Sequence, residues 1–589
     1  MKQKKIVWMT LNAKYTHTSL ALRYLRAVSR DLADTEILEL TINNHLLEIL
    51  GRICEREPDV LGIVCYIWNI EMIRQLLRLL PKVLPQTTLI CGGPEVSYDT
   101  GAFMREFPMV DYVVRGEGEE VIPALLHCLD TGEEPVGLAG IAWRSRPSGQ
   151  IVTGTAVTVG DMAAVPFPYD AEEMPALRER ILYYETSRGC PFTCAYCLSC
   201  ATQGVRYLPL ERVMTELRFF VRQNVRQVKF VDRTFNANKA HFMPILEFIA
   251  QLRPECRTNF HFEIAVDYMD DEVLDLLERM PVGRVQLEIG IQSTNETTLA
   301  DVSRVNHWQR IRHNIQRIMA YHNMHVHVDL IIGLPHEDQV SFARSFNDVY
   351  ALQTDMLQLG FLKFLKGSAM MSLAQEGDYR YMDMAPYTVL ANRWLSYQEI
   401  YWFQIFESVF ESYYNAGRCR RTAAYFIREY EDGDAFSFYR KFTDYWKKQE
   451  YHHMAHAVQS LYAYMRDFCQ SFYPVEAAMT DALLRFDALT ADHGRIRPLL
   501  LNWNLEKYQA VTAAFWKDGR ASRYISGYHF TNWRDLRRRY HLEIFDYNVQ
   551  QADQGRLQHQ TAVLLFNYEA VDVIWYVVDK EDLQFGKDL

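Results

Sequence analysis

The sequence predicts an α/β protein made of a doubly wound parallel sheet, a partial (β/α)6 barrel of TIM type and a mostly α C-terminal domain. Three observations predict this class. Apolar strand-like runs alternate with helical stretches from the first residues, the alternation resumes at residue 181, and long aromatic-rich helical stretches dominate beyond about residue 369. Near-continuous apolar strands that alternate with helices indicate parallel sheets covered on both faces. The predicted parts are 1–135, a linker with a hairpin at 136–180, 181–368 and 369–589.

Length and composition set broad limits. A chain of 589 residues is too long for one core and predicts roughly three domains. The formal net charge of −11 argues against a large nucleic-acid surface, so we do not expect a nucleic-acid partner. No secretory signal pattern and no apolar run of membrane-spanning length is present, so we expect a cytoplasmic protein without a membrane partner. The 11 cysteines are too dispersed for a secreted disulfide framework.

Each predicted element follows from a short apolar run or a helical stretch between turn-forming residues. The strands of the first part begin at Ile6, Glu36, Val60, Thr88 and Asp111. Those of the barrel are 181–185, 228–232, 260–264, 285–291, 326–332 and 356–361. A barrel of six units still places ligands at the carboxyl ends of its strands. The C-terminal part has helical stretches at 394–410, 423–430, 436–446 and 453–468, and a closing hairpin at 562–578.

Cys190, Cys194 and Cys197 form a C-x3-C-x2-C motif directly after the first barrel strand. Thiolates are the usual protein ligands of [4Fe–4S] clusters. A loop this tight supplies three ligands and leaves one iron open, as chelation by the amino and carboxylate groups of S-adenosylmethionine (SAM) requires. The alternative is a structural zinc site, which prefers four closed ligands and would use Cys200 as the fourth. The position at the top of a βα strand favours the cluster.

On this motif and on the strands that follow it, residues 180–365 resemble the radical SAM superfamily. The resemblance implies SAM contacts from the ends of the later strands, at Asp232, Glu288, Gln292, Arg304 and Gly333. Three of these residues have a structural alternative. Asp232 could cap the following turn, Glu288 could be a buried ion-pair partner, and Arg304 could be a surface arginine. The G-G-E pattern usual after the second strand is absent, so the contact with the SAM amine stays open.

Four short motifs follow successive strands of the first part, at the edge where open α/β sheets bind ligands. Glycines at this edge let a ligand approach the backbone. The candidate ligand residues are Asn12, Tyr15, His17, Trp68, Gly92, Gly93, Pro94, Glu95, Ser97, Gly116 and Glu117. No G-x-G-x-x-G follows the first strand, which disfavours a dinucleotide site.

On these motifs, and on its position ahead of the radical SAM segment, the first part resembles the cobalamin-binding domains of B12-dependent radical SAM proteins. The resemblance implies a Rossmann/flavodoxin-like domain whose candidate residues contact cobalamin. The D-x-H-x-x-G motif that supplies a histidine to cobalt in many B12 enzymes is absent. We therefore expect cobalt without a histidine below it, with His17 as the alternative ligand.

The C-terminal third resembles the uncharacterised, DUF4080-like extension of a subset of these proteins. Its many aromatic residues predict a packed helical core, and a lid over the substrate pocket is the alternative. Arg534, Arg537, Arg538 and Arg539 form a basic cluster for which we expect a solvated helix face rather than a phosphate or RNA site. Cys419 and Cys469 are isolated, so no auxiliary iron–sulfur cluster is expected.

Together the resemblances imply a radical SAM enzyme that reductively cleaves SAM at a [4Fe–4S] cluster to a 5′-deoxyadenosyl radical. With cobalamin, it would methylate a carbon of an unknown small-molecule or macromolecular substrate. A flavodoxin or ferredoxin is the expected reductant. One alternative is a cobalamin-dependent cyclisation or rearrangement without methyl transfer. The other is a non-catalytic protein that senses B12 or a metal, against which the three-cysteine motif speaks.

Overall fold

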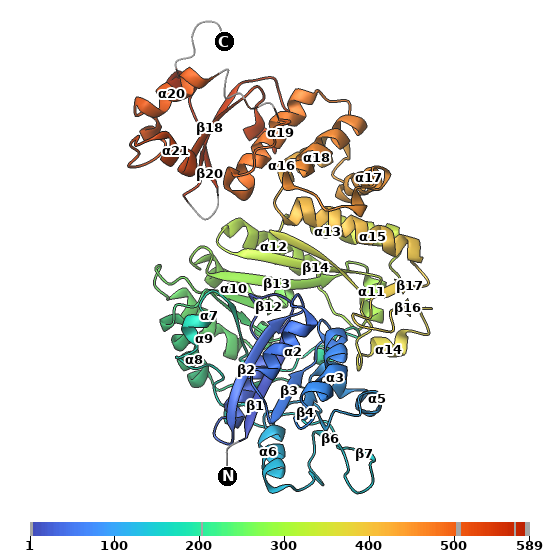
Figure 1. Cartoon of the computed structure of the whole chain (residues 1–589). Helices are drawn as coiled ribbons and strands as arrows, with labels where there is room; N and C mark the ends of the chain where they lie inside the picture. Colours follow the sequence, from blue (N-terminus) through green and yellow to red (C-terminus); the bar gives the residue numbers. More distant parts are fainter. Residues whose placement is uncertain (1–3, 202–203, 502, 504–507, 570–572, 584–589) are drawn as a thin grey trace. The chain divides into compact units, whose positions relative to one another are not determined.

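The computed structural model describes residues 4–201, 204–501, 503, 508–569 and 573–583 (Figure 1). The side chains of Cys200, Ala201 and Asp492 lie outside the described set. Two compact units divide the chain: unit 1 is Met1–Ser345 with Leu352–Ile400, and unit 2 is Phe346–Ala351 with Tyr401–Leu589. In the described part of the chain, no helix is long and apolar enough to cross a membrane.

The N-terminal sheet of unit 1 has seven strands in the order β2-β1-β3-β4-β5-β6-β7. The first five are parallel, and β6 and β7 run antiparallel. Their bounds are β1 Lys5–Asn12, β2 Asp34–Thr41, β3 Val60–Val64, β4 Thr88–Gly92, β5 Tyr112–Val114, β6 Ile141–Arg144 and β7 Ile151–Thr153. This confirms the doubly wound sheet, whose strand order reverses between β1 and β3. The hairpin predicted in the linker is β6–β7, and it extends this sheet.

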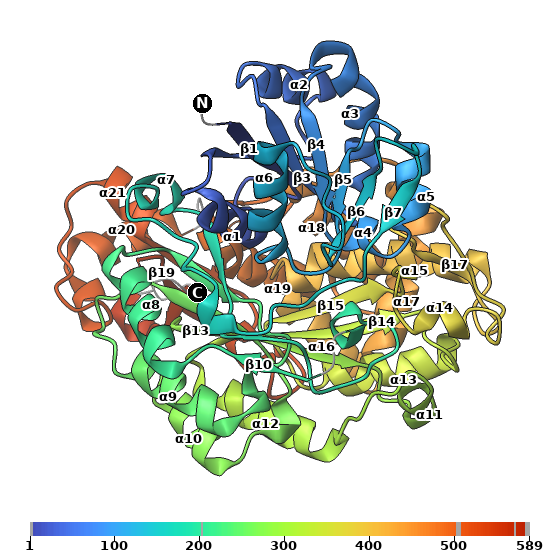
Figure 2. The ribbon, with the colours of Figure 1, turned by 90° about the horizontal axis from the view of Figure 1, so that it is seen from below.

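Helices cover both faces of the N-terminal sheet. The helices of this part are α1 Leu20–Ser29, α2 Leu46–Cys54, α3 Ile70–Val83, α4 Pro94–Ser97, α5 Thr100–Glu106 and α6 Val121–Thr131, and α7 Met174–Leu177 follows in the segment before β8. α1 packs beside α6 and α2 beside α3, and Figure 2 shows the two pairs on opposite faces. α3 buries Ile73, Leu76, Leu77 and Leu80, the spacing of one helical face. These faces bury the sheet on both sides, as its continuous apolar strands predict.

The second sheet of unit 1 has six parallel strands in the order β15-β14-β13-β12-β11-β8. Their bounds are β8 Ile181–Tyr184, β11 Gln227–Phe230, β12 Asn259–Ile264, β13 Val285–Gln292, β14 His325–Ile332 and β15 Met356–Phe361. The helices are α8 Leu210–Arg222, α9 Lys239–Ala250, α10 Asp271–Glu278, α11 Glu296–Asp301, α12 Trp308–Tyr321, α13 Gln339–Tyr350 and α14 Met370–Leu373. Two short strand pairs accompany them, β9 Ser187–Arg188 with β10 Arg206–Tyr207, and β16 Arg380–Tyr381 with β17 Val389–Ala391. The partial barrel is confirmed.

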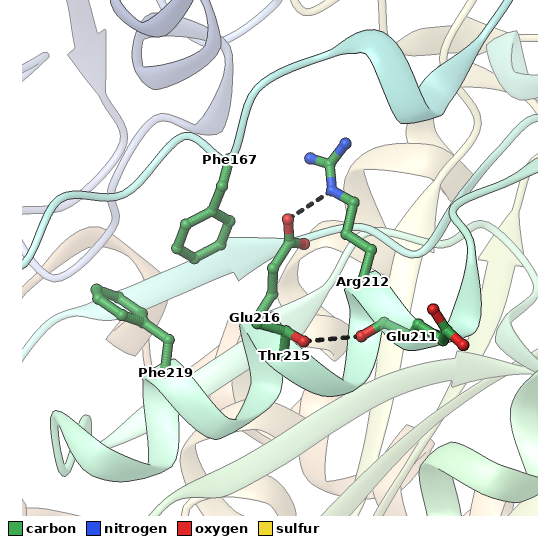
Figure 3. A pocket seen from close by; sticks show the side chains of 6 residues that line it. All are labelled: Phe167, Glu211, Arg212, Thr215, Glu216 and Phe219. Atoms are coloured by element: carbon green, nitrogen blue, oxygen red, sulfur yellow. Dashed lines mark hydrogen bonds and ion pairs between the residues drawn. The ribbon is translucent and has the colours of Figure 1, made fainter.

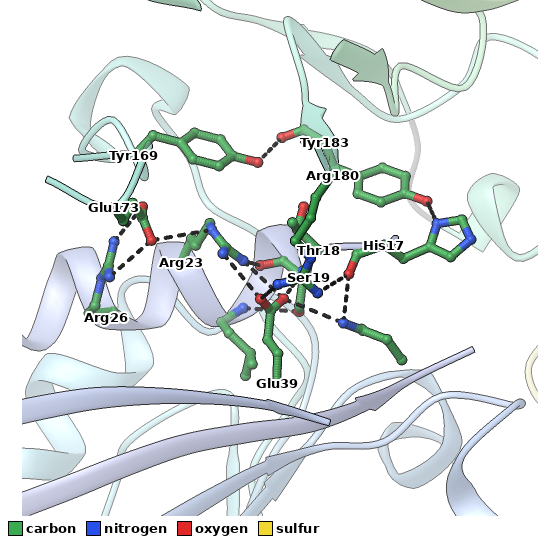
Figure 4. A network of polar contacts seen from close by, with 12 residues as sticks. His17, Thr18, Ser19, Arg23, Arg26, Glu39, Tyr169, Glu173, Arg180 and Tyr183 are labelled. Carbon is green, nitrogen blue, oxygen red and sulfur yellow. Dashed lines mark hydrogen bonds and ion pairs between the residues drawn. The ribbon is translucent and has the colours of Figure 1, made fainter. Parts of the chain in front are cut away.

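A junction network of polar side chains joins the N-terminal sheet to the barrel (Figure 4). The loop after β1 lies along β8, where Thr18 Oγ1 donates to the Ile181 carbonyl at 2.8 Å. Glu39 of β2 accepts two hydrogen bonds from Arg23, at 3.0 and 3.1 Å, and one from Arg180 at 3.0 Å. The side chains of Arg23 and Glu39 are only 2% and 6% exposed. Burial alone would raise the pKa of Glu39, but the two arginines hold it below its ordinary value.

Unit 2 contains helices followed by a three-stranded antiparallel sheet. The helices are α15 Tyr397–Phe410, whose first four residues belong to unit 1, α16 Arg420–Tyr430, α17 Ala435–Lys448, α18 Val458–Phe472, α19 Ala477–Thr490, α20 Gln509–Lys517 and α21 Trp533–Arg539. The strands are β18 Tyr540–Phe545, β19 Ala562–Asn567 and β20 Ile574–Val577. Aromatic rings from α15, α17 and α18 pack against one another, for example Phe406 on Phe436 and Phe442 on Phe468. This confirms a helix-rich region with an aromatic core.

The sequence did not predict β18, which pairs with β19 beside the predicted hairpin. The arginine cluster lies on α21, where Arg539 pairs with Asp535 and Glu569 and Arg538 pairs with Asp535. Part of this basic charge is therefore already neutralised within the domain.

Candidate functional site

The three-cysteine loop follows β8 and β9 at the carboxyl end of the barrel strands. Gly189 opens it with a φ of 101°, and a Cβ there would lie 2.0 Å from the Gly204 carbonyl oxygen, so only glycine fits. Cys190 Sγ lies 3.5 Å from Thr234 Oγ1, and Cys197 Sγ accepts a hydrogen bond from a backbone amide at 3.4 Å. Cys194 is 6% exposed. The thiols make only weak contacts and are available as ligands.

The three thiols do not all lie within 4.8 Å of one another. Among the described His, Cys, Asp and Glu residues, only Glu288, His327 and Asp329 form a group of three or more whose ligand atoms all lie within 4.8 Å of one another. Zinc–sulfur bonds of about 2.3 Å in tetrahedral geometry place two sulfurs about 3.8 Å apart. Each thiolate of a [4Fe–4S] cluster binds its own iron, so a cluster does not require the three sulfurs to converge on one point. The zinc alternative depends on Cys200, whose side chain lies outside the described residues.

Arg304 borders the same loop. Its Nη1 lies 3.7 Å from Cys194 Sγ and 3.2 Å from the Tyr196 hydroxyl, and its Nη2 donates to the Gly290 carbonyl. Burial would lower the pKa of Arg304, but Tyr196 and Cys194 raise it above its ordinary value. A permanent positive charge therefore stands beside the cluster loop, where it suits a carboxylate ligand. The predicted contact with SAM stays a prediction.

Asp232 lies at the end of β11 and is 1% exposed. Its carboxylate accepts hydrogen bonds from the Thr186 amide at 2.9 Å, the Thr186 hydroxyl at 2.6 Å and the Ser187 hydroxyl at 2.7 Å. Burial raises the pKa of Asp232 to about 6, against these hydrogen bonds, which lower it. The carboxylate holds the end of β11 to the segment that leads into the cluster loop, and its predicted contact with SAM stays untested.

The other SAM candidates lie on β13 and after β14. Glu288 is in the middle of β13 and pairs with Lys229 at 2.8 Å and His261 at 3.0 Å. Burial alone would raise the pKa of Glu288, but these two partners hold it well below its ordinary value. Gln292 has a φ of 70° where the register of β13 shifts, which re-aims its side chain at the strand end. Gly333 has a φ of 94°, as a sharp turn after β14 requires.

Glu337 is a buried acid that the sequence analysis did not select. It is 0% exposed, and its Oε1 accepts hydrogen bonds from Ser293 at 2.7 Å and Ser345 at 3.0 Å. Its Oε2 has no hydrogen-bond partner among the described residues. Burial raises the pKa of Glu337 to about 7. The carboxyl group ties the end of β13 to the segment after β14, both of which were expected near SAM.

Replacing Glu337 with glutamine is expected to flatten the pH dependence of stability. The folded state holds this proton more tightly than the unfolded chain, so wild type loses stability as pH rises from about 4.5 to about 7. The loss is of the order of 2–3 kcal/mol, and the neutral amide avoids it. Urea unfolding between pH 5 and pH 8 measures the effect. The exposed Glu278→Gln variant is the control; a wild-type pH slope in Glu337→Gln would contradict the assignment.

Two exposed aromatic side chains flank the switch point of the N-terminal sheet. Tyr15, in the loop after β1, is 74% exposed, and Trp68, after β3, is 45% exposed. The Trp68 ring stacks on Tyr66 with ring centroids 4.4 Å apart, and its Nε1 donates to the Leu11 carbonyl at 3.1 Å. Exposed rings held in fixed positions at this edge fit a large planar ligand such as a corrin.

The polar candidates after β1 are engaged within unit 1. The Asn12 side chain donates to the His17 carbonyl at 3.0 Å. His17 Nδ1 lies 2.7 Å from the hydroxyl of Tyr183, a barrel residue. Burial lowers the pKa of His17, which favours the neutral ring. His17 therefore helps to join the N-terminal sheet to the barrel, and its role toward cobalt stays untested.

The motif after β4 forms a tight turn into α4. It contains the candidates Gly92, Gly93, Pro94, Glu95 and Ser97. Gly93 has a φ of 102°, and a Cβ there would lie 2.5 Å from the Cys65 carbonyl oxygen. The Ser97 hydroxyl donates to the Gly93 carbonyl at 2.8 Å. Glu95 is buried, which raises its pKa, and it accepts a hydrogen bond from the Tyr387 hydroxyl at 2.6 Å. The backbone of this turn therefore lies at the sheet edge, where a ligand could approach it closely.

The motif after β5 connects the N-terminal sheet to the cluster loop. A Cβ on Gly116 would lie 2.1 Å from the Val157 carbonyl oxygen. Glu117 accepts hydrogen bonds from Arg206 at 2.6 and 2.9 Å and pairs with Arg188 at 3.1 Å. Arg188 also pairs with Glu119 and stands two residues before Cys190. Sequence reasoning missed Arg188, because a lone arginine carries no signal of its partners.

A separate open hollow lies on the outer side of the barrel (Figure 3). Phe167 and residues Glu211, Arg212, Thr215, Glu216 and Phe219 of α8 line it. Arg212 and Tyr184 both donate to Glu216, at 2.6 Å each. None of the predicted site residues lines this hollow, and we assign it no role in the site.

Comparison with known families divides the chain into three parts. The B12 binding domain family matches residues 6–126, the Radical SAM superfamily matches residues 184–349, and a protein family of unknown function, DUF4080, matches residues 375–566. The chain therefore combines a B12-binding domain, a radical SAM domain and a C-terminal DUF4080 domain.

Curated relatives carry several activities. The chain is 28% identical over 316 residues to the cobalamin-dependent radical SAM methyltransferase TokK of Streptomyces tokunonensis, covering 50% of this chain and 44% of TokK. It is 27% identical to the uncharacterized methyltransferase PH0819 of Pyrococcus horikoshii, covering 39% of this chain and 52% of that protein. It is 20% identical to an anaerobic magnesium-protoporphyrin IX monomethyl ester cyclase of Rubrivivax gelatinosus, covering 56% and 58%. The chain thus spans about half the length of these relatives.

Two solved structures share the fold. The radical SAM methyltransferase TsrM of Kitasatospora setae, with cobalamin and a [4Fe–4S] cluster bound, aligns with a TM-score of 0.54 at 17% identity over 64% of this chain and 78% of TsrM. The cobalamin-dependent SAM radical enzyme OxsB, with aqua-cobalamin and SAM bound, aligns with a TM-score of 0.59 at 14% identity over 85% of this chain and 82% of OxsB.

Proposed function

We propose that this chain, a member of the cobalamin-dependent radical SAM family, transfers a methyl group to a carbon atom of its substrate. The family's cofactors are a [4Fe–4S] cluster, SAM and cobalamin. The observation that carries the proposal is a three-cysteine loop and a sheet edge flanked by exposed aromatic rings, both within one unit. The methyltransferase relatives support methyl transfer as the outcome.

Each cofactor has residues that would hold it. Cys190, Cys194 and Cys197 would bind three irons of the cluster, and Arg304 would bind the carboxylate of SAM. Tyr15 and Trp68 would pack against the corrin. When bound, these groups supply one-electron cleavage of SAM, hydrogen abstraction from an unactivated carbon and a carrier for the methyl group.

The chain's own contribution is positioning and charge. The Arg304 guanidinium offers a fixed cation at the cluster loop. Arg188, immediately before that loop, pairs with Glu117 of the N-terminal domain. The same side chain therefore connects the loop to the carboxyl edge of the N-terminal sheet. We propose a flavodoxin or ferredoxin as the electron donor.

A second candidate is cyclisation or rearrangement without methyl transfer. The magnesium-protoporphyrin IX monomethyl ester cyclases favour it, since they match about as much of this chain as the methyltransferases do. A third, a non-catalytic B12- or metal-sensing protein, would form no 5′-deoxyadenosine.

The test is anaerobic reconstitution with iron, sulfide and hydroxocobalamin, followed by incubation with reductant and SAM that carries a deuterated methyl group. Candidate substrates would come from extracts of the source cells, and products would be read by mass spectrometry. A product that gains the labelled methyl supports the proposal. A product formed with 5′-deoxyadenosine but without the labelled methyl would favour cyclisation or rearrangement. If no 5′-deoxyadenosine forms, both enzymatic proposals are contradicted.

Arg304→Ala is expected to weaken SAM binding about 10- to 100-fold, because a charge-assisted hydrogen bond contributes about 1.5–3 kcal/mol. Calorimetric titration of the reconstituted protein with SAM measures the change, and iron analysis verifies that the cluster is present. Arg310→Ala removes the same charge from an exposed site at the start of α12 and should bind SAM like wild type. Equal affinities for the two variants would remove Arg304 from the SAM site.

Trp68→Ala is expected to reduce bound cobalamin to less than about half of the wild-type amount after gel filtration, since a stacking aromatic contributes about 1–3 kcal/mol. The corrin absorbance per chain is the readout. Trp533→Ala, which removes a similarly exposed tryptophan from unit 2, is the matched control. Full corrin retention in Trp68→Ala would place the cofactor elsewhere.

A further inference from the structure

Ionisable side chains line the lumen of the partial barrel. β13 alternates strictly between buried residues and half-exposed ones, and Glu288 is one of the half-exposed set. His327 stands opposite Glu288 on β14, and Lys229 of β11 stands opposite His261 of β12. Barrel interiors of this type are usually filled by branched apolar residues. Charged side chains in the barrel interior are therefore stable only if they bind a ligand or pair fully with one another.

Three of these side chains converge. One ligand atom each of Glu288, His327 and Asp329 lies within 4.8 Å of the other two. His327 Nε2 is 3.0 Å from Asp329 Oδ1, and His261 Nε2 is 3.0 Å from Glu288 Oε2. Glu288, His327 and Asp329 thus face a small common space, and His261 lies beside this group through its contact with Glu288.

Each of the two imidazoles contacts a carboxylate at 3.0 Å but makes no well-directed hydrogen bond to it. His261 and His327 are 6% and 7% exposed, yet the Nε2 atom of each has no hydrogen-bond partner among the described residues. The carboxylate oxygens are near enough but lie off the direction in which the ring nitrogens point. A buried polar atom without a partner costs about 1–3 kcal/mol. A cation bound at these nitrogens would remove that cost.

Charge and access also favour a cation. Three carboxylates, of Glu263, Glu288 and Asp329, face Lys229 in the lumen and Arg233 at the end of β11. The three carboxylates outnumber the two cations only when Glu263 is ionised and both imidazoles are neutral, because burial raises the pKa of Glu263 and the neighbouring carboxylates raise that of His327. The side chains of Glu288 and Asp329 are 24% and 21% exposed, so the group is open on the side of the lumen. Metal sites that act on substrates keep such an open position.

We propose that Glu288, His327 and Asp329, with His261 as a further ligand, bind one divalent first-row transition metal ion in the barrel lumen. Mixed imidazole and carboxylate ligands select zinc, iron(II) or manganese over magnesium and calcium. The open side of the ion would take water or an oxygen atom of the substrate. The site uses none of the three cysteines and does not depend on methyl transfer, and it assigns Glu288 to the metal ion in place of the SAM contact that the resemblance implies.

Zinc is the probe, and the full-length chain with Cys190, Cys194 and Cys197 all changed to alanine is the background, so that thiolates cannot take up the metal. About one zinc per chain is expected after dialysis, measured by elemental analysis. His327→Ala and Glu288→Gln in this background should each lower zinc at least about tenfold. His325→Ala, on the same strand, should retain it. Cobalt(II) substitution should give ligand-field bands without sulfur charge transfer.

The outcomes separate this proposal from the proposed function. No zinc in the cysteine-free background, or unchanged zinc in both His327→Ala and Glu288→Gln, would overturn the site. If His327→Ala fails to fold by circular dichroism, the near-isosteric Glu288→Gln and Asp329→Asn variants decide. Loss of SAM cleavage in the cysteine-free chain with zinc retained would support a second metal site, while failure of SAM cleavage in wild type would leave the zinc result unaffected.

Discussion

Cys194→Ala is expected to abolish both the [4Fe–4S] cluster and SAM cleavage. Cys194 is the central and most buried of the three cysteines, and its sulfur lies 3.7 Å from Arg304. An alanine methyl group cannot bind iron, and two thiolates cannot hold three corners of a cube. After anaerobic reconstitution, iron per chain should fall from about four to less than about one, with loss of the charge-transfer absorbance. Formation of 5′-deoxyadenosine should drop below detection.

The control for this loss is Cys256→Ala. Cys256 is half-buried before β12 and outside the cysteine loop, so iron content and cleavage should match wild type. A thermal melt of each variant separates loss of the cluster from loss of the fold. Four irons retained in Cys194→Ala would refute the assignment of Cys194 as a cluster ligand. Zinc in place of iron in the wild-type protein would support the structural zinc site instead.

Glu39→Ala is expected to destabilise the chain by about 3–5 kcal/mol, the usual cost of removing one partner of a buried ion pair. Glu39 is the carboxylate shared by Arg23 and Arg180, and it also accepts the Ser19 amide. Its removal leaves two guanidinium groups, 2% and 13% exposed, without that partner. Urea unfolding followed by tryptophan fluorescence measures the change.

Glu36→Ala is the matched control, since Glu36 lies on the same strand but pairs with Arg56 at the surface, where its side chain is 40% exposed. It should cost less than about 1 kcal/mol. The pKa of Glu39 is depressed in the folded state, so its stabilisation is present above pH about 4.5 and is lost as pH falls below that value. The difference in stability between the two variants should therefore shrink as pH falls below about 4.5. Equal losses at pH 7 would show that the junction network contributes little.

The strands were predictable because their apolar runs are short and bounded by turn-forming residues. All six barrel strands lie within two residues of the predicted bounds, and the three cysteines fall at the predicted strand end. The carboxyl ends of parallel strands meet at one edge of the sheet. The motifs at Trp68 and Gly93 could therefore be placed at that edge without knowledge of any side-chain contact.

Pairings between distant segments could not be predicted. Asp232 accepts from Thr186 and Ser187, 46 and 45 positions away, and Arg188 reaches a carboxylate 69 positions away. Nothing in the local pattern of an isolated acid or arginine encodes its partner. The cluster of Glu288, His327 and Asp329 could not be predicted for the same reason, since Glu288 and His327 become neighbours only through the register of β13 with β14. β18, Tyr540–Phe545, lies in a segment between the arginine cluster and the closing hairpin for which the sequence analysis made no prediction.

The junction network has a consequence for how such a protein can be assembled. The N-terminal domain is aligned with the barrel by ion pairs such as Glu39 with Arg180 and Glu117 with Arg206. Residues 146–150, between β6 and β7, are exposed. A chain cut in that turn would keep every one of these pairs, so a corrin-carrying subunit and a radical-generating subunit encoded separately would meet in the same geometry.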